Sequence, residues 1–146
     1  MKHQITPEQF SANEDAPSAI LDAPFKAFLL PYHAEAGAYV TLALPNNFDN
    51  AIRFRVHFLK SGGATRMGVD VGFNFYPLTP TSTVAGSVAC DMIGSDGEVT
   101  TSDWCNVSAD LITGTMISMK VAPSLEETTE DEATVIAMIE VDLGVY

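Results

Sequence analysis

The chain has 146 residues and a formal net charge of −12, from 7 basic and 19 acidic side chains. This length predicts a single domain that can bury a core without a metal or a disulfide staple. So acidic a chain repels phosphate backbones, which excludes nucleic acid as an expected partner. It contains no apolar run of membrane-spanning length and no signal-peptide pattern at its start, so we expect synthesis in a cytoplasm and no membrane partner.

The first 24 residues are polar and are broken by three prolines. They predict an N-terminal arm over residues 1–24, followed by a domain over residues 25–146. Thr6 and Pro7 are typical of the start of a short helix. The arm has two alternatives: it crosses to a neighbouring subunit, or it folds back on its own domain. In the first case its anchors would be the apolar side chains of Ile5, Phe10, Ile20 and Leu21.

The strongest pattern in the chain is a strict alternation of apolar and polar residues between residues 51 and 76, which is typical of half-buried strands. A Ser-Gly-Gly sequence at residues 61–63 supplies a turn, so we expect an antiparallel pair. One face of this pair is very apolar and needs a second sheet to cover it. That face carries Ile52, Phe54, Val56, Phe58, Val69, Val71, Phe73 and Phe75.

Shorter apolar segments separated by turn residues predict the remaining strands. We expect them at residues 25–33, 38–44, 84–93, 98–107, 116–121 and 133–146, with one helical turn at 108–111. Many short strands with almost no helix indicate an all-β protein, either a sandwich or a barrel.

The sequence contains no pattern of a known catalytic or metal site. His3, His33 and His57 fall in separate segments, whereas a zinc site needs converging ligands. We therefore expect a protein that is not an enzyme and that holds no cofactor. Cys90 and Cys105 have no metal-binding spacing and are expected as free thiols, with a mutual disulfide as the alternative.

Two charged clusters each allow two interpretations. The acidic residues between Glu126 and Glu132 could bind calcium, but they lack the spacing of a dedicated loop and are better explained as a solvated loop. Arg53 and Arg55 share one face of a strand in an otherwise acidic chain. They are either solvated charges or a contact with acidic surface on a neighbouring subunit.

The order of these features resembles a group of small virion proteins of tailed bacteriophages. The similarity covers residues 39–146. Its elements are an apolar strand leading into a Pro and Asn/Asp turn at 42–49, an alternating strand at 51–59, a Ser/Gly turn and Gly-Val strand at 61–75, a short segment at 108–114, and a closing strand at 135–141.

This resemblance implies an antiparallel jelly-roll β-sandwich of about eight strands, often trimeric. It implies a capsid decoration (cement) protein, located on the capsid surface of the virion, that binds the major capsid protein and stabilises the head. The alternative on the same fold is a tail-associated module that binds a receptor or a carbohydrate. Exposed aromatic side chains usually mark such a site, and the candidates are Tyr32, Trp104 and Tyr146.

Overall fold

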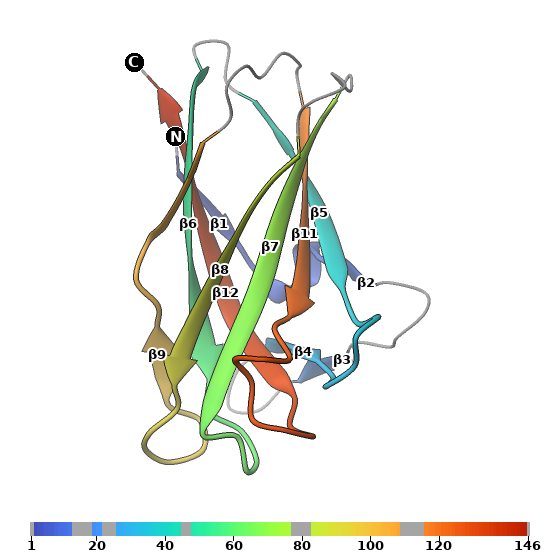
Figure 1. The fold of residues 1–146 in the computed structure, drawn as a ribbon, viewed down its shortest axis with the longest axis vertical. Coiled ribbons are helices and arrows are strands. Elements are labelled where there is room, and N and C mark those ends of the chain that lie inside the picture. Colours follow the sequence, from blue (N-terminus) through green and yellow to red (C-terminus); the bar gives the residue numbers. More distant parts are fainter. Residues whose placement is uncertain are drawn as a thin grey trace.

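A computed structural model describes residues 2–12, 19–21, 26–44, 48–76, 83–108 and 116–145. Their strands form two antiparallel sheets that pack face to face (Figure 1), and the only helix in these ranges is a single 3₁₀ turn, Pro7–Gln9. The predicted all-β sandwich is confirmed. No helix among the described residues is long and apolar enough to cross a membrane.

The seven-stranded sheet is built around two long central strands, β6 (Phe48–Leu59) and β12 (Thr134–Val145). Each of them pairs on its outer side with two shorter strands in succession. These are β9 (Val99–Thr101) and β10 (Cys105–Ser108) on β6, and β1 (Lys2–Ile5) and β4 (Ala27–Leu30) on β12, with β3 (Ala19–Leu21) next to β4.

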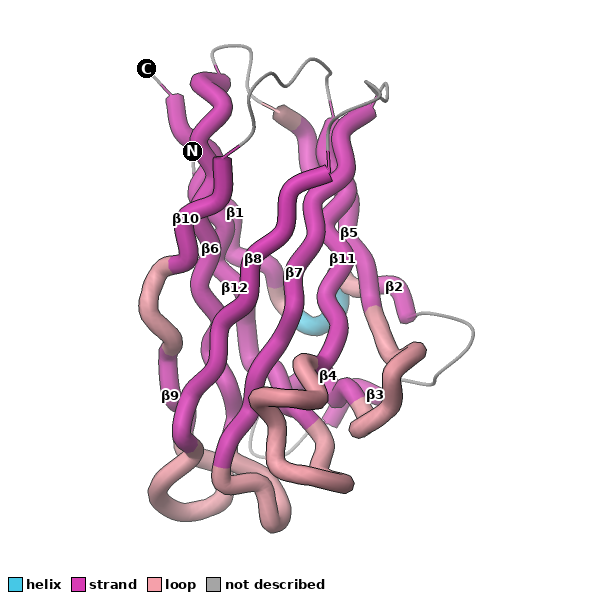
Figure 2. Tube along the Cα trace, viewed as in Figure 1, coloured by secondary structure: helices cyan, strands magenta, loops and turns pink. Residues whose placement is uncertain are grey.

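The five-stranded sheet has the order β2-β5-β11-β7-β8. In Figure 2 its strands run roughly along the long axis of the molecule, with β8 and β2 at opposite edges. The bounds are β2 (Ser11–Ala12), β5 (Ala38–Ala43), β11 (Met116–Pro123), β7 (Arg66–Tyr76) and β8 (Thr83–Asp91).

The expected antiparallel pairing of the two alternating strands is wrong. β6 hydrogen-bonds to β12, β9 and β10, whereas β7 hydrogen-bonds to β11 and β8 in the opposite sheet. The turn at residues 61–63, where Gly62 has φ +63°, carries the chain from one sheet to the other. The physical reason is that each strand has a strongly apolar face, and facing sheets bury both faces against each other. Phe54 and Phe73 meet there with ring centroids 5.9 Å apart.

Each described strand of the segment expected as an arm pairs with a strand of its own chain. β1 joins β12, β2 joins β5 in the other sheet, and β3 joins β4. The expected helix start is present as the 3₁₀ turn, where the Thr6 backbone N–H donates to Gln9 Oε1 at 2.9 Å. These contacts match the alternative in which the segment folds back on its own domain.

The expected strand at residues 98–107 is interrupted between β9 and β10. Ser102 occupies the gap, where its backbone N–H donates to the Val56 carbonyl at 2.9 Å and its hydroxyl oxygen accepts from the Val56 N–H at 3.0 Å. A side chain thus replaces one step of the ladder, so the edge strand breaks without leaving the β6 backbone unpaired. The helical turn expected at 108–111 falls almost wholly outside the described residues.

We predict that Phe54→Ala lowers the free energy of unfolding by about 3–5 kcal/mol, because its fully buried ring fills the space between the sheets. Equilibrium unfolding in urea measures the change. Val99→Ala, at a side chain that is 44% exposed, is the matched control and should change stability by less than about 0.5 kcal/mol. Equal effects of the two substitutions would contradict the assigned core.

Candidate functional site

The outer face of the five-stranded sheet carries polar and small side chains, because every second residue of its strands points away from the core. β11 shows the pattern clearly, with Ile117, Met119 and Val121 buried beneath exposed or half-buried neighbours. The described residues on this outer face include Tyr39, Thr41, Ala43, Asp70, Gly72, Asn74, Ala85, Ser87, Met116, Ser118, Lys120 and Ala122.

One row of register partners across four strands of this face combines an aromatic ring, a cation and a position without a side chain. Tyr39 on β5 is the register partner of Lys120 on β11, Lys120 is that of Gly72 on β7, and Gly72 is that of Ala85 on β8. Tyr39 is 48% exposed. A side chain added at Gly72 would meet no atom within 4 Å of its first carbon. The aromatic ring and the lysine therefore stand beside a stretch of sheet that offers room for a ligand.

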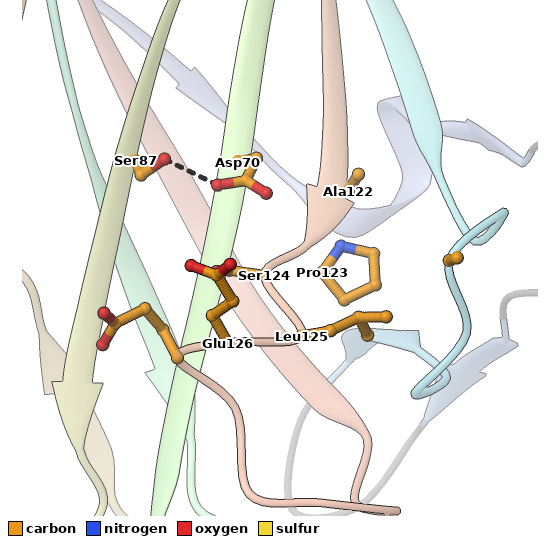
Figure 3. A pocket seen from close by; sticks show the side chains of 9 residues that line it. Asp70, Ser87, Ala122, Pro123, Ser124, Leu125 and Glu126 are labelled. Atoms are coloured by element: carbon orange, nitrogen blue, oxygen red, sulfur yellow. Dashed lines mark hydrogen bonds between the residues drawn. The ribbon is translucent and has the colours of Figure 1, made fainter.

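A pocket of about 520 Å³ borders this row where the chain leaves β11. Its wall includes the next register row, Ala122, Asp70 and Ser87. Figure 3 shows Asp70 and Ser87 side by side on β7 and β8, with the Ser87 hydroxyl donating to Asp70 Oδ1 at 2.6 Å. The remaining wall is Ala34 and the segment from Pro123 to Glu127.

The loop that forms this wall is held by contacts from three directions. Tyr32 donates its hydroxyl to the Leu125 carbonyl at 3.2 Å. Glu127 Oε2 accepts from Arg66 Nη2 at 2.6 Å, and Ser124 N–H donates to the Gly68 carbonyl at 2.9 Å. A pocket with a fixed wall does not have to be ordered when a ligand binds, which lowers the entropic cost of binding.

The outer face of the seven-stranded sheet is filled by its own side chains. Arg53 pairs with Asp142 at 2.9 Å, and Arg55 pairs with Glu140 at 3.1 Å. Both guanidinium groups lie over the Trp104 ring, with Cζ 4.3 Å and 4.5 Å from its centroid. The two arginines expected as a subunit contact are thus paired within the chain, and Trp104 is covered by them.

Glu140 is the most enclosed charge of this cluster, with a side chain only 11% exposed. Its Oε1 lies 2.7 Å from His57 Nε2, and Thr101 Oγ1 lies 2.8 Å from His57 Nδ1. Burial alone would raise the pKa of the Glu140 carboxyl, but hydrogen bonds from His57 and Arg55 outweigh it and hold this pKa below its usual value. The arrangement ties β12, β6 and β9 together.

The expected N-terminal anchors divide into two groups. Ile5 is fully buried in this chain's core, and Phe10 stacks on Phe28 with ring centroids 5.3 Å apart. The side chains of Ile20 and Leu21 lie outside the described residues, as does Tyr146. A contact of this segment with another subunit stays a prediction.

No group of three His, Cys, Asp or Glu side chains within the described ranges is placed to hold a metal ion. In the acidic loop, Glu127 is already paired with Arg66. Cys90 and Cys105 are both free thiols and half-buried, and burial raises the pKa of the Cys90 thiol.

Sequence reasoning singled out aromatic residues but missed Tyr39. A signal was present, because Tyr39 shares the exposed phase of its strand with Thr41, opposite the apolar Val40 and Leu42. Lys120 occupies the same outward phase of β11. What the sequence lacks is the register that places the two residues next to each other.

Comparison of the fold finds carbohydrate-binding modules among the solved structures. The CBM36-1 domain of a multidomain xylanase from the hindgut metagenome of Trinervitermes trinervoides aligns over 100% of both chains, with a TM-score of 0.65 and 10% identity. A carbohydrate-binding module CBM36 in complex with calcium and xylotriose covers 97% of this chain and 99% of its own, with a TM-score of 0.64 and 13% identity.

A third such structure, the xylan-binding module CBM15, aligns over 99% of this chain and 97% of its own, with a TM-score of 0.59 and 11% identity. At these identities the likeness shows the β-sandwich fold. No protein-family model and no curated protein matches the chain.

We predict that the free energy of unfolding of Glu140→Gln falls less with acidification than that of the wild-type protein. The pKa of the Glu140 carboxyl is lower in the folded than in the unfolded state. The carboxyl therefore stabilises the protein at pH values above its unfolded pKa, near 4.5, and this contribution is lost as the pH falls through its folded pKa. The free energy of unfolding should be about 1–3 kcal/mol lower than wild type at neutral pH and should converge with it on acidification. Urea unfolding between pH 7 and pH 3 measures both.

The exposed Glu130→Gln is the control and should follow the wild-type pH dependence. A Glu140→Gln protein whose stability falls with acid as steeply as wild type would show that Glu140 does not carry the effect.

Proposed function

We propose that the protein is a non-catalytic carbohydrate-binding module, and that it binds a glycan on the outer face of the five-stranded sheet. The observation that carries the proposal is the exposed ring of Tyr39 beside the side-chain-free floor at Gly72, next to a pocket whose wall is already ordered. Protein sites for small ligands combine an aromatic or apolar surface with a few placed polar groups.

The chemistry of this face suits a sugar. A pyranose ring has a C–H face that packs on an aromatic ring, whose π-surface carries partial negative charge. Its hydroxyl groups need both donors and acceptors around the ring. Asp70 accepts only, while Ser118 and Thr41 both donate and accept. Met116, 45% exposed on the same face, adds apolar contact area.

The fold neighbours supply a first choice of ligand. Their names describe a domain of a xylanase, a module with bound xylotriose and a xylan-binding module. Xylan and short xylose oligomers are therefore the first ligands to test, ahead of other polysaccharides.

The capsid decoration reading has less support from the contacts within the chain. Ile5 and Phe10 pack against this chain's own core, and Arg53 and Arg55 are paired with its own carboxylates. Binding to a major capsid protein, a trimeric state and a place on the virion stay predictions. A tail-associated module that binds a carbohydrate, the alternative to capsid decoration in the sequence analysis, would use this same face.

We predict that Tyr39→Ala reduces the affinity for a bound glycan by about five- to 150-fold, because stacking on an aromatic ring contributes about 1–3 kcal/mol in comparable contacts. Affinity electrophoresis in soluble xylan, followed by calorimetry with xylose oligomers, measures the change. Ile93→Ala is the matched control, since Ile93 is 81% exposed and lies outside this face. A Tyr39→Ala protein that binds like wild type would remove the face from consideration.

A second substitution tests the face without removing any contact. Gly72→Leu places a bulky side chain into open space, so the fold should tolerate it while the ligand cannot. We expect binding to be lost with a free energy of unfolding unchanged or raised by up to about 1 kcal/mol, because a strand glycine is intrinsically unfavourable. Gly72→Ala should retain most of the binding. Full affinity in Gly72→Leu would place the ligand elsewhere.

A further inference from the structure

Lys120 is set apart from the other cations of the chain. The sequence has seven lysine and arginine side chains, and all seven lie in the described ranges. Six of them have a partner: a carboxylate for Lys26, Arg53, Arg55 and Arg66, a backbone carbonyl for Lys60, and the Trp104 ring for Lys2. Lys120 is exposed and has no such partner among the described residues, in a chain with 19 acidic residues.

Protection of a sheet edge does not explain this lysine. Lysines often guard edge strands against pairing with other chains. β11, however, is hydrogen-bonded to β5 on one side and to β7 on the other, so it offers no free edge.

The register neighbours of Lys120 do not neutralise its positive charge, so its ammonium group is available to a ligand. Its register neighbours are Tyr39, which is neutral, and Gly72, which has no side chain. The carboxylate of Asp70, in the next register row, already accepts a hydrogen bond from the Ser87 hydroxyl on β8, as Figure 3 shows.

We propose that Lys120 selects glycans that carry an acidic group, with a carboxylate of a uronic acid bound by its ammonium while a neighbouring sugar stacks on Tyr39. This inference rests on the proposed function and adds the chemical class of the ligand. Lysine binds such a group as a point charge with three donors, so it needs proximity rather than a fixed bidentate geometry.

The test uses two pairs of probes that share a backbone and differ in charge. One pair is glucuronoxylan and its carboxyl-reduced form, and the other is polygalacturonate and its methyl-esterified form. Calorimetry or affinity electrophoresis compares wild type with Lys120→Met, which keeps the length of the side chain and removes its charge. Lys26→Met is the matched control, because it makes the same change in net charge at an exposed site paired with Glu8.

We expect wild type to bind the acidic form of at least one pair about three- to tenfold more tightly than the neutral form, the range for a partly exposed charged contact. Lys120→Met should abolish this preference, so that the variant binds both forms of a pair with equal affinity. Lys26→Met should keep the preference, and Lys120→Arg should restore most of it.

The outcomes separate this inference from the proposed function. Equal affinity of wild type for both forms, or a preference that survives in Lys120→Met, overturns the role of Lys120 while glycan binding stands. Binding that survives in Tyr39→Ala and Gly72→Leu overturns the assigned face. Failure of folded wild-type protein to bind any of the four probes counts against both proposals together.

Discussion

The structure depends on the contact between the apolar faces of β6 and β7 across the sandwich. Phe54 and Phe58 on one strand and Phe73 and Phe75 on the other are fully buried. Neither strand could bury this surface by pairing with the other in one sheet, because their apolar faces would then point to the same side. Packing face to face removes both from water, and the other strands extend the two sheets around that contact.

This arrangement leaves two outer faces with different chemistry. On the seven-stranded sheet, Arg55 and Glu140 form ion pairs beneath Trp104, and little of that face is free for a ligand. On the five-stranded sheet, Gly72 has no side chain and Ala85 has only a methyl group, so this part of the sheet is left open. The first face stabilises the sheet through cross-strand contacts. The second carries polar side chains beside the open space at Gly72, which is what the proposed binding surface requires.

Alternation along the sequence was sufficient to predict the longer strands and the sandwich, but not β1, β2 and β3 or the partner of each strand. The period of two tells which side of β6 is apolar, yet it carries no information on which strand hydrogen-bonds to it. For this reason β6 and β7 were expected as a pair. The partners of Arg53 and Arg55 lie 89 and 85 residues further along the chain, so the stripe looked unpaired. Tyr39 and Lys120 are likewise adjacent only through the register of β5 and β11.

The charges on the outer face of the five-stranded sheet are unevenly distributed, with the lysine and the carboxylates at different positions. Lys120 stands beside Tyr39, whereas Asp70, Glu126 and Glu127 lie toward the pocket at the end of β11. A neutral sugar can donate hydroxyl protons to the carboxylates, but an acidic group would be repelled there and attracted near the lysine. In a chain of net charge −12, the proposed acidic glycan would be oriented by Lys120, because this is the lysine that has no partner among the described residues.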